Sequence, residues 1–291
     1  MFEGIHTALI TPFRDDQVDE DALRGLVERQ IEAGIDGLVP CGSTGESATL
    51  SYVEHRAVVE IVIDAAGGRV PVIAGTGSNS TREAIEFTAH ARDAGADGAL
   101  LLSPYYNKPT QEGIYAHYAA IARETGLPLI LYNIPGRTAS NIAPQTVARL
   151  AHLPGIVGIK EASGDLEQIA HVIAKSPPDF VVLSGDDALT LPLLSIGGKG
   201  VISTTSNVAP NRVLELVRRF VAGDAAGARQ LHYQLLPLFD ALFCETNPIP
   251  VKAAAAALGW CEDEIRLPLT KLDDARLERL KVVMKDVGIL R

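Results

Sequence analysis

The stretch Gly155-Ile156-Val157-Gly158-Ile159-Lys160 is a short apolar run that ends in a lysine. Apolar residues on both faces of a strand are typical of a parallel sheet that is covered on both sides. Lys160 would then lie at the carboxyl end of a buried strand. Burial disfavours the ammonium form, so some neutral amine would be available to attack a ketone. Because a strand-end lysine can also extend into solvent or bind a phosphate, Lys160 alone leaves its role open.

Similar apolar runs alternate with helix signals along the whole chain. Ser51 with Glu54 and Ser80 with Glu83 both match the Ser-x-x-Glu capping box that begins a helix, and the pair Asp165 and Gln168 resembles it. We predict eight strands, at residues 5–10, 37–40, 70–75, 98–103, 127–133, 155–160, 180–184 and 200–203.

Eight strands that alternate with helices predict an α/β fold, the closed (β/α)8 TIM barrel. Such a barrel needs about 250 residues, and the chain has 291. We assign residues 1–224 to the barrel and residues 225–291 to a C-terminal helical extension, with late helices near residues 211–222, 225–244 and 273–287. A doubly wound open sheet is the alternative. In a barrel, the active site lies on the loops that follow the strands.

Composition limits the class of protein. Hydrophobic residues make up 47% and charged residues 21% of the chain, which indicates a folded protein. The net charge of −10 comes without a basic cluster, so we expect no nucleic acid partner. Three cysteines and seven histidines show no metal-ligand spacing, which predicts no metal and a reduced, cytoplasmic protein. Neither a signal peptide nor an apolar stretch near the roughly 18 residues of a membrane span is present, so we expect no membrane partner.

Loops after three predicted strands carry groups suited to an acid substrate. Residues 42–47, Gly-Ser-Thr-Gly-Glu-Ser, combine a tight turn with adjacent hydroxyl groups, which suits a carboxylate. Tyr105 and Tyr106 follow the fourth strand, while Tyr132 and Arg137 lie at the end of the fifth. A tyrosine beside an amine can relay protons, and an arginine can hold a carboxylate by two bonds. Taken alone, each tyrosine is better explained as a packing residue.

Together with the segment Gly158-Ile159-Lys160-Glu161-Ala162, these motifs resemble the pyruvate-dependent class I aldolase family that includes N-acetylneuraminate lyase. The resemblance extends from Thr11-Pro12 to residues 247–252 and 266–268, which is nearly the whole chain. It is strongest to the members that condense pyruvate with L-aspartate-4-semialdehyde, the first committed step of diaminopimelate and L-lysine biosynthesis. It implies a lyase without a metal or organic cofactor, because the lysine imine itself accepts the electrons.

The resemblance also implies roles for single residues. Lys160 would form the Schiff base with pyruvate, and Tyr132 would shuttle protons beside it. Ser43 stands where the family usually has a threonine that links Tyr132 to a second tyrosine. Tyr106 matches that second tyrosine, which in the family reaches the active site of the neighbouring subunit. A homo-oligomer, most simply a dimer of dimers, is therefore expected.

Substrate-binding residues follow from the same resemblance. Thr44 matches the site for the pyruvate carboxylate, and Arg137 matches the residue that holds the carboxylate of the semialdehyde. The backbone at Gly185 and Ile202 lines the same pocket in relatives.

The resemblance further implies an inhibitory site for the end product L-lysine at a dimer interface. Some lysine-sensitive relatives have a histidine at the position of Tyr52, so contacts there would differ. The other positions that match this site are Ser47, Ala48, His55, Asn79, Glu83 and Tyr105.

Two other functions stay open on the sequence. N-acetylneuraminate lyases and keto-sugar-acid aldolases share Lys160, Tyr132 and the loop at residues 42–46. They generally lack an arginine at the position of Arg137, which argues against them here. A non-catalytic relative that acts as a regulator or ligand-binding protein is the second alternative, although every expected catalytic side chain is present.

Overall fold

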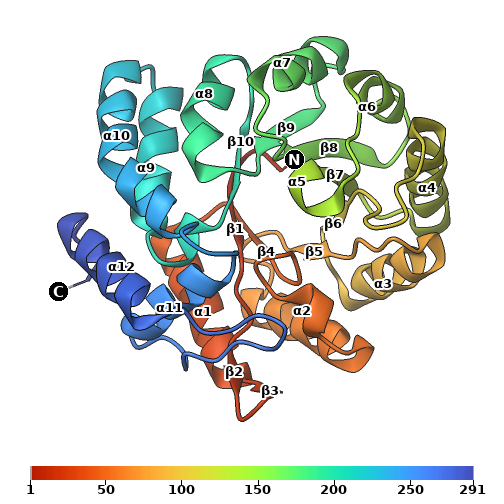
Figure 1. Ribbon diagram of the computed structural model, residues 1–291. Helices are drawn as coiled ribbons and strands as arrows, with labels where there is room; N and C mark the ends of the chain where they lie inside the picture. Colours follow the sequence, from red (N-terminus) through yellow and green to blue (C-terminus); the bar gives the residue numbers. More distant parts are fainter. Residues whose placement is uncertain (1, 291) are drawn as a thin grey trace.

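The computed structural model describes residues 2–290, and its centre is a ring of eight parallel strands (Figure 1). The strands follow the order β4-β1-β10-β9-β8-β7-β6-β5, and an isolated parallel bridge between Leu38 and Val72 joins the two ends of that order. The predicted barrel and its eight strands are therefore confirmed. The strands are β1 (Gly4–Ala8), β4 (Gly37–Val39), β5 (Ile73–Gly75), β6 (Gly98–Leu102), β7 (Leu129–Asn133), β8 (Ile156–Glu161), β9 (Val181–Ser184) and β10 (Gly200–Ser203).

Helices surround this ring, one or more after each strand (Figure 1). Most of them begin with a side chain that accepts a hydrogen bond from a backbone N–H group, and several end at a glycine in the left-handed conformation. They are α1 (Glu20–Ala33), α2 (Tyr52–Ala66), α3 (Thr81–Ala94), α4 (Gln111–Thr125), α5 (Pro135–Thr138), α6 (Pro144–Leu150), α7 (Leu166–Lys175), α8 (Thr190–Ser195) and α9 (Pro210–Val221).

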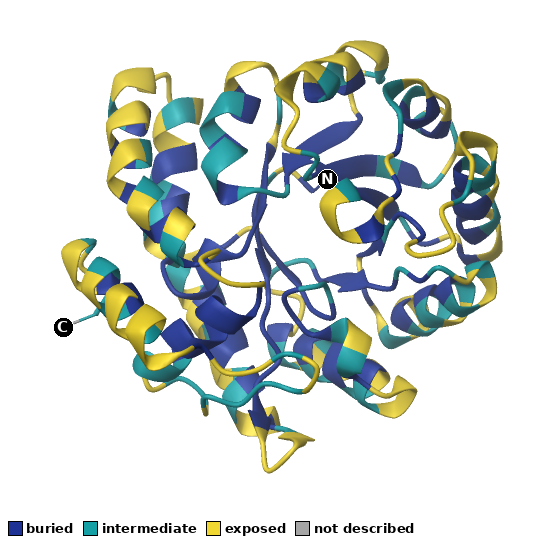
Figure 2. Cartoon of the chain, viewed as in Figure 1, coloured by how far each residue is buried: buried dark blue, intermediate teal, exposed yellow. Residues whose placement is uncertain are grey.

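Two apolar layers hold the barrel together. The larger layer fills the space between the strands and the helices. A smaller cluster fills the inside of the ring and includes Ile73, Ile130, Tyr132 and Ile202. Figure 2 shows the consequence: the strands of the ring are buried over almost their whole length, whereas the helices are buried on one side and exposed on the other. This double coverage explains why the strands read as continuous apolar runs.

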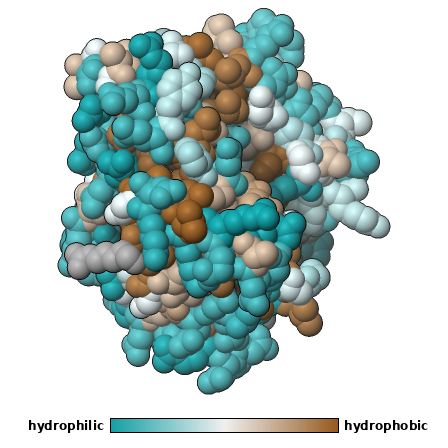
Figure 3. Space-filling view, turned by 60° about the vertical axis from the view of Figure 1, so that its left-hand side comes forward, coloured by the Kyte–Doolittle hydropathy of each residue, from teal (hydrophilic) through white to brown (hydrophobic). Residues whose placement is uncertain are grey.

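Three helices follow the barrel: α10 (Ala225–Ala241), α11 (Ile249–Ala257) and α12 (Asp274–Asp286). Helix α10 packs against α9, α12 packs against α10 and α11, and α11 contacts the turn after β10. Figure 3, which turns this side forward, shows a mostly hydrophilic surface with hydrophobic side chains gathered in its upper middle part. The predicted C-terminal helical extension is confirmed, while its division from the barrel at residues 224 and 225 stays a prediction.

Three local features differ from the sequence expectations. The hairpin of β2 (Phe13–Arg14) and β3 (Gln17–Val18) and the helix α11 were not predicted. The capping box at Ser51 forms in full, but the one predicted at Ser80 forms only in half. Ser80 accepts from the backbone N–H of Glu83, whereas the Glu83 carboxylate accepts from Tyr52 and Ser78 instead. Within residues 2–290, no helix has the length and apolar character needed to cross a membrane.

Candidate active site

Lys160 and Tyr132 are direct neighbours at the end of two adjacent strands. They are register partners on β8 and β7, so both side chains point into the same end of the barrel. The Lys160 Nζ lies 4.3 Å from the centre of the Tyr132 ring. Lys160 and Tyr132 are each only 5% exposed. The phenol and the amine are therefore close enough to act on one bound molecule.

Gly185 lies beside Lys160, and Ile202 belongs to the apolar cluster that contains Tyr132. A Cβ atom at Gly185, just after β9, would stand 2.9 Å from Lys160 Cε and 2.7 Å from the Cβ of Ala162. No side chain fits there unless the lysine moves. Ile202 on β10 is fully buried in the cluster that also holds Tyr132. The absence of a side chain at Gly185 therefore leaves room for the aliphatic stem of Lys160.

The described residues contain two buried lysines, Lys160 and Lys252, and their surroundings differ. Lys252 Nζ lies 2.5 Å from the Glu46 carboxylate, so its charge is neutralised by a partner. No carboxylate within residues 2–290 forms an ion pair with Lys160. The Lys252 amine is thus held by a carboxylate, whereas no such partner holds the Lys160 amine, which is available to react with a bound molecule.

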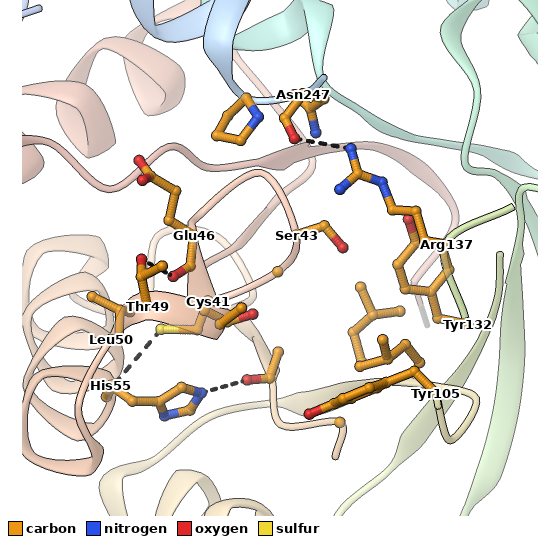
Figure 4. Close-up of a pocket in the computed structure, with 18 of the residues that line it drawn as sticks. Cys41, Ser43, Glu46, Thr49, Leu50, His55, Tyr105, Tyr132, Arg137 and Asn247 are labelled. Carbon is orange, nitrogen blue, oxygen red and sulfur yellow. Dashed lines mark hydrogen bonds between the residues drawn. The ribbon is translucent and has the colours of Figure 1, made fainter. Parts of the chain in front are cut away.

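The loop at residues 42–47 follows β4 and is folded into successive tight turns. The N–H of Gly45 donates to the carbonyl of Gly42 over 3.0 Å, and that of Glu46 donates to the carbonyl of Ser43 over 3.3 Å. The hydroxyl of Thr11 donates to the Gly45 carbonyl over 2.7 Å. Ser43 faces the pocket that Tyr132 also lines (Figure 4). The loop therefore brings a hydroxyl group toward the reactive end of the barrel.

Thr44 is buried next to Ser43 and is held by polar neighbours. Its hydroxyl accepts from Asn247 Nδ2 over 2.9 Å and lies 3.4 Å from the hydroxyl of Thr204. One hydroxyl group and one amide thus set the orientation of the Thr44 side chain. A fixed hydroxyl is suited to bind one oxygen of a small carboxylate.

Arg137 stands on α5, directly after the strand that carries Tyr132. Its Nη2 donates to the backbone carbonyl of Asn247 over 2.9 Å (Figure 4). The residue is exposed and lines the pocket, and no carboxylate within residues 2–290 pairs with it. The remaining N–H groups of the guanidinium can therefore bind a carboxylate from solution.

Asn247 is a site residue that the sequence analysis did not single out. Its side chain holds Thr44, and its backbone carbonyl holds Arg137, so one residue joins the two expected carboxylate sites. Its Oδ1 is buried without a partner among the described residues. The Asn-Pro-Ile-Pro segment was noted only as part of the resemblance. The sequence signal that could have revealed it is a polar residue directly before Pro248, in a segment that also contains Pro250.

Several of these residues line one cavity of about 450 Å³, a volume in the range of small-molecule sites, whereas Lys160 and Thr44 are not among its lining residues. Ser43, Tyr132, Arg137 and Asn247 line it. Residues expected at the L-lysine site line the same cavity, namely Ser47, Ala48, Tyr52, His55, Glu83 and Tyr105. Asn79 stands beside it and donates from Nδ2 to the carbonyl of Tyr105 over 3.2 Å. The expected inhibitory site and the expected active site are therefore continuous within one chain.

His55 and Glu83 show how the expected inhibitory site is organised. The Nε2 of His55 donates to the carbonyl of Gly75 over 2.8 Å, and burial lowers the pKa of the imidazole, so the ring is neutral near pH 7 (Figure 4). Both oxygen atoms of Glu83 already accept bonds, one from Tyr52 and one from Ser78. An ammonium group would have to share or replace those partners.

Tyr106 lies apart from this cavity. Its side chain is 88% exposed and its φ of 70° is in the left-handed region. Within a single chain the structure therefore does not bring Tyr106 to Ser43 or Tyr132. A surface aromatic ring held in an uncommon backbone conformation is available to a partner molecule.

The chain belongs to the dihydrodipicolinate synthetase family, whose model matches residues 1–287. A relative from Syntrophus aciditrophicus (strain SB), named 4-hydroxy-tetrahydrodipicolinate synthase, is 58% identical over 290 residues, which is 100% of each chain. The crystal structure of dihydrodipicolinate synthase from Aquifex aeolicus superposes with a TM-score of 0.98 at 48% identity, and the match covers 99% of each chain.

Two further solved relatives carry small molecules. A chloride-inhibited dihydrodipicolinate synthase from Acinetobacter baumannii is complexed with pyruvate and matches with 47% identity, a TM-score of 0.97 and 100% coverage of both chains. The enzyme from Cyanidioschyzon merolae has lysine bound and matches with 45% identity, a TM-score of 0.97 and 99% coverage of both.

Proposed function

We propose that the chain is a lyase with the activity of 4-hydroxy-tetrahydrodipicolinate synthase. It condenses pyruvate with L-aspartate-4-semialdehyde and so begins the diaminopimelate route to L-lysine. The identity to its relatives over the full length supports this function over a sugar-acid lyase or a non-catalytic relative. The pyruvate complex of a 47% identical relative supports pyruvate as the first substrate.

The observation that carries the proposal is the contrast between the two buried lysines. Lys160 is buried against Tyr132 and has no anionic partner within residues 2–290, whereas Lys252 is paired with Glu46. The Lys160 amine attacks C2 of pyruvate, water leaves, and a protonated imine forms. Loss of a proton from C3 then gives an enamine, because the imine accepts the electron pair.

The second half of the reaction uses the other end of the pocket. The enamine carbon C3 attacks the aldehyde carbon of the semialdehyde, whose carboxylate is held by Arg137. The amino group of this substrate then attacks the former C2, and Lys160 leaves as a free amine with the ring closed. Tyr132, whose ring centre lies 4.3 Å from the amine, moves protons in the imine-forming steps. No metal is needed for this route, and the expected absence of a cofactor stays a prediction.

Borohydride trapping tests the assignment of the nucleophile. Reduction in the presence of pyruvate should add one reduced pyruvate unit per chain, on the peptide that contains Lys160. Lys252 is the internal control, since it is equally buried but ion-paired. Labelling of Lys252, or of neither lysine, would contradict the mechanism. A sugar-acid lyase working in reverse would join pyruvate to N-acetylmannosamine. We expect this chain to show no such condensation when it is given those two compounds.

L-Lysine is the proposed inhibitor, and the lysine-bound relative supports it. The cavity that Tyr52, His55 and Glu83 line is continuous with the active site, so a bound amino acid there lies close to the substrate loop. The exposed ring of Tyr52 suits an ammonium group, and the Glu83 carboxylate can bind one by sharing or replacing its bonds from Tyr52 and Ser78. Initial rates with millimolar L-lysine and a calorimetric titration should show inhibition and binding heat. Unchanged rates without binding heat would reject the site.

A further inference from the structure

A buried ion pair joins the substrate loop to the C-terminal segment of the chain. Glu46 belongs to the loop after β4 and Lys252 to α11, and their side chains are each 1% exposed. The Nζ lies 2.5 Å from Oε1. Glu46 lines the cavity, but Figure 4 shows its carboxylate pointing away from Ser43, and the Lys252 amine occupies that carboxylate. The mechanism proposed above uses neither residue of the pair, so the function of the pair needs a separate explanation.

Further contacts hold both charges in place. Oε2 of Glu46 accepts from the backbone N–H of Arg266 over 3.2 Å. The Lys252 Nζ and the Arg266 guanidinium each lie 4.2 Å from the centre of the Phe13 ring. Arg266 also pairs with Glu54 at the start of α2 over 2.6 Å. The C-terminal segment thus holds the loop through the fully buried pair of Glu46 and Lys252 and through the partly buried Arg266.

The backbone of Glu46 adopts an unfavourable conformation, which these contacts stabilise. Its φ of 53° lies in the left-handed region, which residues with a side chain seldom adopt. Such a conformation persists only where the surroundings enforce it. The N–H of Glu46 donates to the carbonyl of Ser43, so the turn at Glu46 also orients Ser43 and Thr44. Release of the Glu46 side chain would let the turn relax and move both hydroxyl groups.

We propose that Glu46 and Lys252 are positioning residues, whose ion pair holds the loop at residues 42–47 in the conformation that binds the pyruvate carboxylate. This inference rests on the proposed function. Loss of the pair should weaken pyruvate binding and leave the chemistry at Lys160 largely intact. It should therefore raise the KM for pyruvate more than it lowers kcat.

Removing one charge and removing both have different effects on stability, which separates positioning from mere folding. A single substitution, Glu46→Gln or Lys252→Met, leaves an unpaired buried charge and is strongly destabilising. The double variant leaves none, so its melting temperature should return toward that of the wild type. If the ion pair only stabilised the fold, the KM of the double variant for pyruvate would also return toward the wild-type value. We expect instead that the double variant keeps a pyruvate KM roughly 10- to 100-fold above the wild type, because the loop is no longer held.

The experiment measures three quantities for each variant: melting temperature, the kinetic constants for pyruvate, and the pyruvate concentration that gives half-maximal borohydride trapping on Lys160. The control is the exposed pair Glu112 and Arg149, for which Glu112→Gln with Arg149→Met should change none of them. If the double variant reaches half-maximal trapping at the same pyruvate concentration as the wild type, the positioning role is wrong. If the double variant does not fold, the single variant Glu46→Gln, whose glutamine can still accept the bond from Arg266, is measured at low temperature. A raised pyruvate concentration for half-maximal trapping then supports the positioning role, and the wild-type concentration overturns it. Absence of trapping in the wild type would instead refute the proposed function.

Discussion

At the scale of single residues, we propose that Arg137 determines which aldehyde the pocket accepts. Its guanidinium is anchored by one bond to the Asn247 carbonyl and has free donors toward the cavity. In the proposed mechanism pyruvate binds to other groups, namely Lys160 and the loop at residues 42–47. Different side chains would then recognise the two substrates, and single substitutions can separate their effects.

Arg137→Ala removes a charge-assisted contact to the semialdehyde carboxylate, normally worth about 1.5–3 kcal/mol. We expect kcat/KM for the semialdehyde to fall by roughly 10- to 100-fold, the factor that corresponds to this energy. Borohydride trapping of pyruvate on Lys160 should be nearly unchanged. Arg149→Ala, on the outer surface, is the matched control. An equal loss of trapping would show that Arg137 serves pyruvate instead.

At the scale of elements, the start of α2 links the barrel to the C-terminal segment. Ser51 and Glu54 form a reciprocal capping box, and the Glu54 carboxylate also accepts two bonds from Arg266. The Arg266 guanidinium lowers the pKa of Glu54 from 4.5 to about 2. Since the folded pKa lies below the unfolded one, the stabilisation is present above about pH 4.5 and is lost as the pH falls toward 2.

Glu54→Gln tests this link, because glutamine keeps the capping box and removes the charge. We expect the variant to be less stable than the wild type by about 1.5–3 kcal/mol at pH 7. The difference should shrink steadily between pH 4.5 and pH 2. Urea unfolding of both proteins across this range measures it, and Glu161 and Asp187, whose pKa values burial raises, contribute equally to both. A difference that is independent of pH would contradict the ion-pair explanation.

The elements that the sequence predicted are those with a local signal. Continuous apolar runs identify all eight strands, because both faces of each strand are covered. Helix α11 was missed because its apolar residues, from Ile249 to Ala257, are buried nearly all round and show no helical period. Glu83 was assigned to a capping box, but Tyr52 from another helix competes for its carboxylate. Contacts between distant segments decide such cases, as they do for Asn247 and for the pair of Glu46 with Lys252.

At the scale of the whole molecule, one chain supplies most of the proposed site but not Tyr106. That side chain is 88% exposed, and Tyr105 next to it is 38% exposed. Tyr52 and Val53 on α2 are exposed as well, at 59% and 77%. Large apolar side chains of this kind are typical of a surface that meets a second molecule. We therefore propose that a second copy of the chain covers this surface, in a dimer or a dimer of dimers, and places its Tyr106 at the site.

Mixing two inactive variants tests this shared site. Tyr106→Phe removes the hydroxyl that one subunit would lend, and Lys160→Ala removes the nucleophile of the other. In a hybrid dimer, one of the two sites then contains both an intact Lys160 and an intact Tyr106. We expect each variant alone to have little activity, and a mixture that was unfolded and refolded together to regain up to about a quarter of the wild-type rate, since half of random dimers are hybrids with one complete site. Mixtures prepared without subunit exchange are the control. Full activity in a stable monomer, or Tyr106→Phe with wild-type activity, would show that each chain completes its own site.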